Sequence, residues 1–78
     1  MNYKTEKVDE VVLALLYLTS FSEGDVQRAW KGHDWEALDR LHEKGFVSDP
    51  KSKAKSIVFS EDGFKKAKDL FQNYFGLE

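Results

Sequence analysis

The chain has 78 residues, of which 41% are hydrophobic, 14% are aromatic and 33% are charged. This composition is typical of a small globular domain rather than of a disordered chain. No cysteine is present, which excludes disulfide bonds, thiolate metal sites and a cysteine nucleophile. We therefore expect one domain spanning 1–78, with a small core and a narrow margin of stability.

The net charge of −2 is unevenly distributed along the chain. Residues 1–50 carry six basic and ten acidic side chains, whereas residues 51–78 carry six basic and four acidic ones. The isoelectric point near 5.7 lies below the value above about 9 that is usual for nucleic-acid-binding domains. The overall charge therefore counts against DNA as the main partner.

The N-terminal segment lacks the apolar core of a signal peptide, because acidic residues interrupt it. The longest apolar run, 11–18, has eight residues and is too short to span a membrane. We expect a cytoplasmic protein with no membrane partner. Residues 1–4 are expected to be disordered, and Leu77-Glu78 resembles an expression scar left by a vector.

The first helix is predicted to begin near Thr5, whose hydroxyl can cap it. One face carries apolar residues at helical spacing: Val8, Val11, Val12, Leu15 and Leu18. The uninterrupted run 11–18 covers every direction around the axis, so the helix cannot be half-exposed. It is either enclosed by other elements or gives one face to a partner chain. Thr19-Ser20 is expected to end it.

A second helix is predicted from Ser22 to about Trp30, because Ser22 and Asp25 resemble a capping box. Gly32 is expected to supply a left-handed turn before the third helix. Asp34 should cap that helix and Gly45 should end it, with an inner face made of Trp35, Leu38 and Leu41.

Two short strands are predicted at 46–48 and 56–59, joined by a polar loop that contains Pro50. They should pair antiparallel and pack on Leu38 and Leu41, because a hairpin this short needs a helix beneath it. Ser60 is expected to cap the last helix. That helix has apolar residues at helical spacing: Phe64, Ala67, Leu70, Phe71, Tyr74 and Phe75.

The order helix, strand, loop, strand, helix resembles the second half of a winged helix-turn-helix domain. The phrases Leu38-x-x-Leu41-x-x-Lys44-Gly45-Phe46-Val47 and Val58-Phe59-Ser60-Glu61-Asp62-Gly63 carry the resemblance. It implies a small α+β winged-helix domain with three helices, a short antiparallel β-hairpin wing and a C-terminal helix.

A more particular likeness is carried by Ala29-Trp30-Lys31-Gly32-His33-Asp34-Trp35, Leu41-His42-Glu43-Lys44-Gly45-Phe46 and Lys53-Ala54-Lys55-Ser56. This combination resembles a family of short bacterial proteins with no assigned function. The likeness implies no catalytic residue.

The third helix is a poor candidate for reading the major groove, because its exposed positions are mostly acidic. Arg40 is expected to be neutralised by Glu36 and Glu43 of the same helix. Basic residues lie instead in the wing and on the last helix: Lys51, Lys53, Lys55, Lys65, Lys66 and Lys68. They could contact phosphate, or the wing lysines could keep a sheet edge soluble, and we favour the second interpretation.

Trp30 and Trp35 flank the turn that contains His33. They could form an aromatic cage or a platform on which a base stacks, but their spacing favours positions in the core. His33 and His42 lie in no metal-binding signature, and the serines and glycines form no nucleophile elbow or phosphate loop. We expect no enzyme, no metal and no cofactor.

These observations predict a non-enzymatic binding module that acts through protein contacts, including self-association as a homodimer. Surplus apolar side chains on the first and last helices are the candidate interface: Leu13, Leu16, Tyr17, Phe71, Tyr74 and Phe75. The alternative is a DNA-binding transcriptional regulator whose wing and last helix supply the affinity, with weak binding to nucleic acid.

Overall fold

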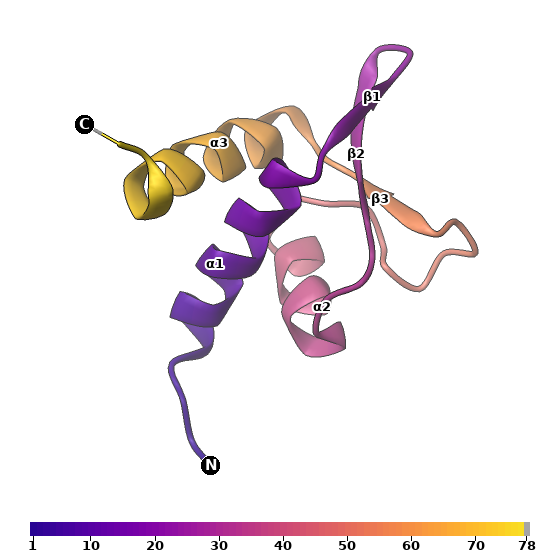
Figure 1. Cartoon of the computed structure of the whole chain (residues 1–78). Coiled ribbons are helices and arrows are strands. Elements are labelled where there is room, and N and C mark those ends of the chain that lie inside the picture. Colours follow the sequence, from indigo (N-terminus) through magenta and orange to yellow (C-terminus); the bar gives the residue numbers. More distant parts are fainter. Residues whose placement is uncertain (78) are drawn as a thin grey trace.

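Residues 1–77 are described by a computed structural model, and Glu78 lies outside the described residues, so the interpretation of Leu77-Glu78 as an expression scar falls partly outside them. Three helices stand beside a three-stranded antiparallel sheet (Figure 1). The elements are α1 (Thr5–Leu18), β1 (Phe21–Glu23), β2 (Val26–Trp30), α2 (Trp35–Glu43), β3 (Ser56–Val58) and α3 (Glu61–Phe75). The predicted α+β class is confirmed, and the arrangement is compatible with a winged-helix layout.

Helix α1 begins at Thr5, the residue that was predicted to cap it, so the N-cap lies one residue earlier than predicted. Lys4 occupies the N-cap position and no side chain caps it, so Thr5 is already helical. At the other end, the hydroxyl of Thr19 donates to the carbonyl oxygen of Leu15 over 3.2 Å, and that of Ser20 donates to Tyr17 over 2.7 Å. These bonds satisfy carbonyl groups that the last helical turn leaves free. Residues 1–4 form no helix or strand, and their disorder stays a prediction.

The segment predicted as a second helix is a β-hairpin. Gly24 has a φ of +61° and is the first of two turn residues between β1 and β2. This position favours glycine in tight hairpin turns. The side chains of Ser22 and Gln27 hydrogen-bond across the hairpin at 2.9 Å. The prediction of a helix from 22 to 30 is therefore wrong.

Helix α2 has both predicted ends. Asp34 accepts a hydrogen bond from the amide of Ala37 over 3.1 Å, and Gly45 has a φ of +80°. The amide of Phe46 donates to Leu41 over 3.0 Å, which completes a Schellman motif. Gly32 is not in the left-handed region, so that expectation is wrong.

Strand β3 pairs mainly with β2, with Ala29 opposite Ile57. The predicted pairing of 46–48 with 57–59 is reduced to one bridge between Val47 and Phe59, with a bond of 2.8 Å from the amide of Ser48 to the carbonyl oxygen of Val58. Strand β2 is the central strand of the sheet, with β1 paired to one edge and β3 to the other.

A close junction joins the end of α2 to the start of α3. The hydroxyl of Ser60 donates to the carbonyl oxygen of Gly45 over 2.6 Å and accepts from the amide of Gly63 over 2.9 Å, as the predicted cap requires. A Cβ atom at Gly63 would overlap the carbonyl oxygen of Phe46. Only glycine lets the first turn of α3 approach so closely.

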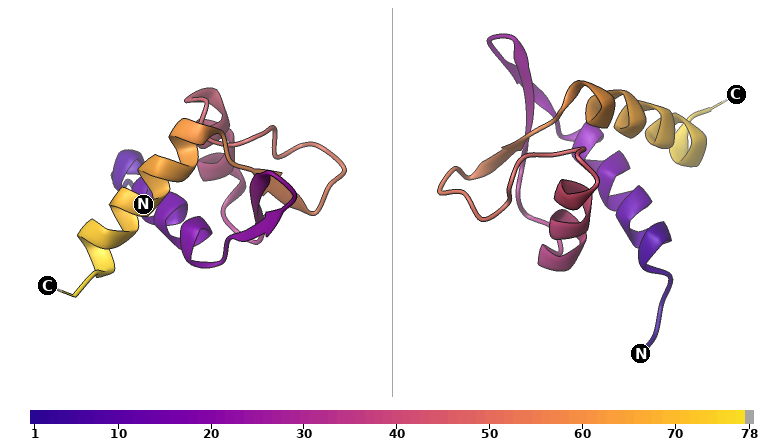
Figure 2. Two further views of the ribbon diagram at one scale, coloured as in Figure 1. Left: turned by 90° about the horizontal axis from the view of Figure 1, so that it is seen from above. Right: turned by 180° about the vertical axis from the view of Figure 1, so that it is seen from behind.

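Helix α1 lies between α2 and α3, and the helices cover one side of the sheet (Figures 1 and 2). Its inner face follows Asp9, Leu13 and Leu16, all of them buried. Among the helices of residues 1–77, none has the length and apolar character needed to cross a membrane. The remaining core comes from every layer of the fold: Val12, Ala14, Ala29, Ala37, Leu38, Leu41, Val47, Ile57, Phe59, Ala67 and Leu70.

Candidate functional site

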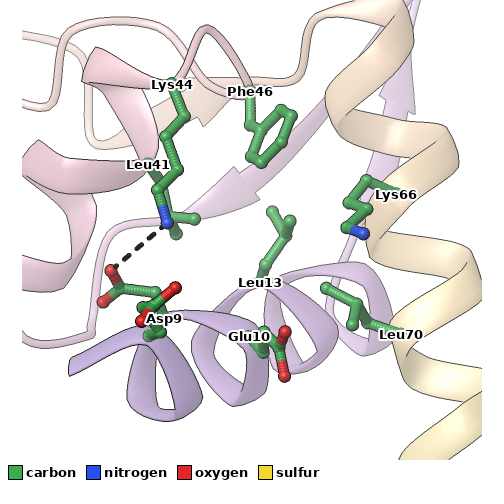
Figure 3. A pocket seen from close by; sticks show the side chains of 9 residues that line it. Asp9, Glu10, Leu13, Leu41, Lys44, Phe46, Lys66 and Leu70 are labelled. Carbon is green, nitrogen blue, oxygen red and sulfur yellow. Dashed lines mark ion pairs between the residues drawn. The ribbon is translucent and has the colours of Figure 1, made fainter. Parts of the chain in front are cut away.

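A pocket of about 230 Å³ lies between α1, the C-terminal end of α2 and α3 (Figure 3). Its apolar surface is formed by Leu13, Leu41, Phe46 and Leu70, and its polar surface carries both signs of charge. Acidic groups come from α1, and basic groups come from the end of α2 and from α3. The charged lining residues are Glu6, Asp9, Glu10, Lys44 and Lys66.

Asp9 is held by two cations from the end of α2. Arg40 makes a bidentate contact with its carboxylate, with atoms 2.7 and 2.8 Å apart, and Lys44 Nζ lies 3.9 Å away, as the dashed line in Figure 3 marks. The hydrogen bond to Asp9 raises the pKa of Arg40. The prediction that Arg40 is neutralised by Glu36 and Glu43 is therefore wrong, because its guanidinium reaches across to α1.

Glu10, the next residue, is held from the other side. The hydroxyl of Tyr74 on α3 donates to its carboxylate over 2.6 Å, and Lys7 Nζ lies 3.8 Å away. The hydrogen bond from Tyr74 lowers the pKa of Glu10. Asp9 thus links α1 to α2, and Glu10 links α1 to α3. These two contacts position the three helices around the pocket.

The pocket is small and is lined by apolar and charged side chains. Its volume is below the 300–1,000 Å³ usual for small-molecule sites, so it suits one side chain better than a whole cofactor. No histidine, serine or threonine lines it. Residues 1–77 contain no group of three or more side chains that could hold a metal ion. That the protein is not an enzyme stays a prediction.

The predicted lysines occupy two separate places. Lys51, Lys53 and Lys55 are exposed on the loop that precedes β3, and the other three lie on α3, which begins at the far end of β3 and runs away from the loop (Figure 2). Lys66 borders the pocket. The structure therefore does not join Lys65, Lys66 and Lys68 to the wing lysines in one patch.

The predicted interface residues are also divided. Leu13 and Leu16 are 1% and 0% exposed, so their assignment to a surface is wrong: they point into the core between the helices. Tyr17 and Phe71 are half-buried, with ring centroids 5.6 Å apart. Tyr74 and Phe75 lie at the surface.

An apolar stripe on the opposite side of α1, which we call the outer stripe, was not among the residues predicted to form the interface. It consists of Val8, Val11, Leu15 and Leu18. Leu18 is 60% exposed, and a shallow hollow in the surface is lined by Lys7, Val8, Val11 and Val12. These residues were recognised as an apolar face, but the run 11–18 does not say which side faces inward. The buried position of Asp9 decides that side.

Trp30 and Trp35 are 56% and 59% exposed, so the prediction that they belong to the core is wrong. Trp30 lies on a strand rather than a helix, where its neighbour Ala29 takes the inward position. Its ring instead packs against Phe21 of β1, with centroids 4.9 Å apart. His33, between the two tryptophans, has its pKa lowered by partial burial.

Comparison with known proteins gives a family but no activity. A family model described as a domain of unknown function, DUF6429, matches residues 4–77. The chain is also 44% identical over 75 residues to the uncharacterized protein y4hR of the bacterium Sinorhizobium fredii, covering 96% of this chain and 97% of that protein. No solved structure matches the chain.

Proposed function

We propose that this chain, which belongs to the DUF6429 family, is a non-enzymatic binding module that acts through protein contacts, including self-association. The observation that carries the proposal is the outer stripe. The core of residues 1–77 covers this stripe only in part: Val8, Val11 and Leu15 are half-buried, and Leu18 is 60% exposed. Contiguous exposed apolar surface on a small domain marks an interaction site.

The outer stripe continues onto the end of α3 through Lys7. This residue borders the hollow beside Val8, and its Nζ lies 6.0 Å from the ring centroid of Tyr74. Phe75 follows, with 48% of its surface exposed. A partner that covers the stripe would meet these aromatic rings as well, and aromatic side chains are enriched in interface cores.

A second copy of the chain is the simplest partner, because closed two-fold dimers are the commonest protein assemblies. Sedimentation equilibrium over a wide range of concentration tests this. We expect the mean mass to rise from the 9.0 kDa monomer toward twice that value. A monomer at every concentration would contradict self-association.

Matched variants locate the contact. Leu18→Lys and Phe75→Lys each place a cation near the C-terminal end of a helix, where it favours the helix dipole, so the fold should persist. Both should shift the equilibrium toward monomer. Gln72→Lys makes the same kind of change at an exposed polar position of α3 and should have no effect. Equal effects from all three would show that charge alone, not the apolar surface, controls association.

The alternative is a DNA-binding regulator. The observation that favours it is the group of three lysines on the loop that precedes β3. Lys51, Lys53 and Lys55 are exposed and form no ion pair with any carboxylate in residues 1–77. Three phosphate contacts predict weak, salt-sensitive binding to duplex DNA, with Kd on the order of 10⁻⁴ to 10⁻⁶ M. Nanomolar, sequence-selective binding in a fluorescence anisotropy titration would favour the regulator instead of the protein-contact module.

A further inference from the structure

The sheet has an outer face that the helices do not cover. Because strand residues alternate between faces, Ala29 and Ile57 point into the core while Arg28 and Trp30 point outward. Phe21 pairs with Arg28 in the register and therefore shares the outer face. This face is distinct from the outer stripe of α1 that carries the proposed protein contact.

An aromatic pair occupies this outer face. The rings of Phe21 and Trp30 lie 4.9 Å apart at an angle of 32°, and Trp30 keeps more than half of its surface exposed. Arg28 is fixed on the same face, since its Nη1 donates to Ser56 Oγ over 3.1 Å and its Nε lies 2.8 Å from a carboxylate oxygen of Glu23. The pair is thus held on a rigid strand, with a flat ring open to solvent.

The lysine loop is fastened next to this aromatic pair. Lys31, which directly follows Trp30, donates its amide to the carbonyl oxygen of Lys55 over 3.2 Å. Its ammonium group bonds to the carbonyl oxygens of Pro50 and Ser52, each over 2.8 Å. The residue that directly follows β2 therefore holds the loop at the same end of the sheet as the exposed indole.

Protein sites for single-stranded nucleic acids combine two features, aromatic rings on which bases stack and cations that contact phosphates. The outer face has both. Each unpaired base offers a flat face to an aromatic ring, while the neighbouring phosphates meet cations. A duplex hides those base faces within its own stack. We propose that the outer face of the sheet binds a single-stranded nucleic acid. One base stacks on Trp30, and the neighbouring phosphates of the nucleic acid contact Lys51, Lys53 and Lys55.

Intrinsic tryptophan fluorescence tests the proposal directly. In a Trp35→Phe variant the remaining emission comes from Trp30, and titration with oligothymidylate of about ten nucleotides should quench it. A duplex of the same length should quench it much less. Replacing Trp30 with leucine should weaken binding about 5- to 150-fold in an anisotropy assay, the range measured for one stacked base. A far-UV circular dichroism spectrum like that of the wild-type chain, recorded for each variant, confirms that both substitutions keep the fold.

Two triple variants that remove the same number of positive charges distinguish the contribution of the loop lysines from the effect of overall charge. Changing Lys51, Lys53 and Lys55 to glutamine should weaken binding and reduce the salt slope by about two units, near 0.7 for each lost phosphate contact on a single strand. Changing Lys65, Lys66 and Lys68 to glutamine should leave both unchanged. Equal effects of the two triples, equal binding of duplex, or no quenching of Trp30 would overturn the proposal.

Discussion

Asp9 is the buried charge on which the arrangement of the helices depends. It is 2% exposed and is the only charged residue buried in residues 1–77. Its position in line with Leu13 and Leu16 brings a carboxylate into the core side of α1, where Arg40 and Lys44 meet it. Taking a carboxylate out of water costs several kcal/mol unless it is paired with good geometry. The pair therefore fixes how α1 and α2 lie against each other.

Arg40→Ala should destabilise the protein by about 3 kcal/mol in urea unfolding, because it leaves the Asp9 carboxylate buried with only the more distant Lys44. Asp9→Leu should cost less, since the freed guanidinium can reach water. The double variant Asp9→Leu with Arg40→Met should lie within about 1 kcal/mol of the parent. A double variant as unstable as Arg40→Ala would show that the cost comes from packing and not from the unpaired charge.

The contact between Glu10 and Tyr74 predicts a pH effect. Because the hydroxyl of Tyr74 lowers the pKa of Glu10 in the folded protein, the ionised carboxylate stabilises the fold above its ordinary pKa, and this stabilisation is lost as the pH falls through the folded value. In Tyr74→Phe, the pKa of Glu10 followed by NMR titration should rise toward its ordinary value. An unchanged pKa would mean that Lys7, not the hydroxyl, controls it.

At the scale of elements, residues 22–30 show how one local signal can conceal another. Ser22 and Asp25 stand at the spacing of a helix cap, but Gly24-Asp25 is also a two-residue hairpin turn. The hairpin prevails because β2 gains β3 as a second neighbour, a long-range pairing that local spacing does not reveal. Helix α2 was predictable because Asp34 and Gly45 mark both of its ends without a competing pattern.

The junction between α2 and α3 gives a prediction that opposes helix propensity. Alanine is normally favoured over glycine inside a helix by about 1 kcal/mol. Gly63→Ala should instead destabilise the protein by about 1–3 kcal/mol, because the new methyl group overlaps the carbonyl oxygen of Phe46 and forces α3 outward. Thermal unfolding monitored by circular dichroism measures the change.

Gly32→Ala is the matched control, since a Cβ at that position would meet no atom within 4 Å and its φ is ordinary. This substitution should be neutral or slightly stabilising, by less than about 1 kcal/mol. A parent-like melting temperature for Gly63→Ala would show that the start of α3 can move away from Phe46 at little cost.

At the scale of the whole molecule, the sequence predicts the class of fold better than its surfaces. Periodic apolar residues predict all three helices, and capping residues also mark α2 and α3, but the eight-residue run 11–18 leaves open which side of α1 faces inward. Leu13 and Leu16 were consequently assigned to an interface, whereas Leu18 is the exposed one. Trp30 was assigned to the core for a related reason: a strand reverses the orientation that a helix would give it.

Leu41 tests how little stability the whole domain has in reserve. It is 1% exposed where α2 meets α1, and cutting such a leucine back to alanine leaves a cavity that costs about 2–5 kcal/mol. A chain of this length has a total stability of only about 4–12 kcal/mol. Leu41→Ala should therefore lower the melting temperature by at least about 8 °C, or abolish cooperative unfolding.

The control for this prediction is Leu18→Ala, which removes the same atoms from an exposed position of the outer stripe. At a concentration low enough for monomer, it should change the stability by less than about 0.5 kcal/mol. At high concentration, a self-associating chain gains stability from its partner, so the same variant should then melt below the parent. A loss in Leu18→Ala that equals the loss in Leu41→Ala at low concentration would mean that the stripe is covered within the monomer, and the proposed contact surface would have to lie elsewhere.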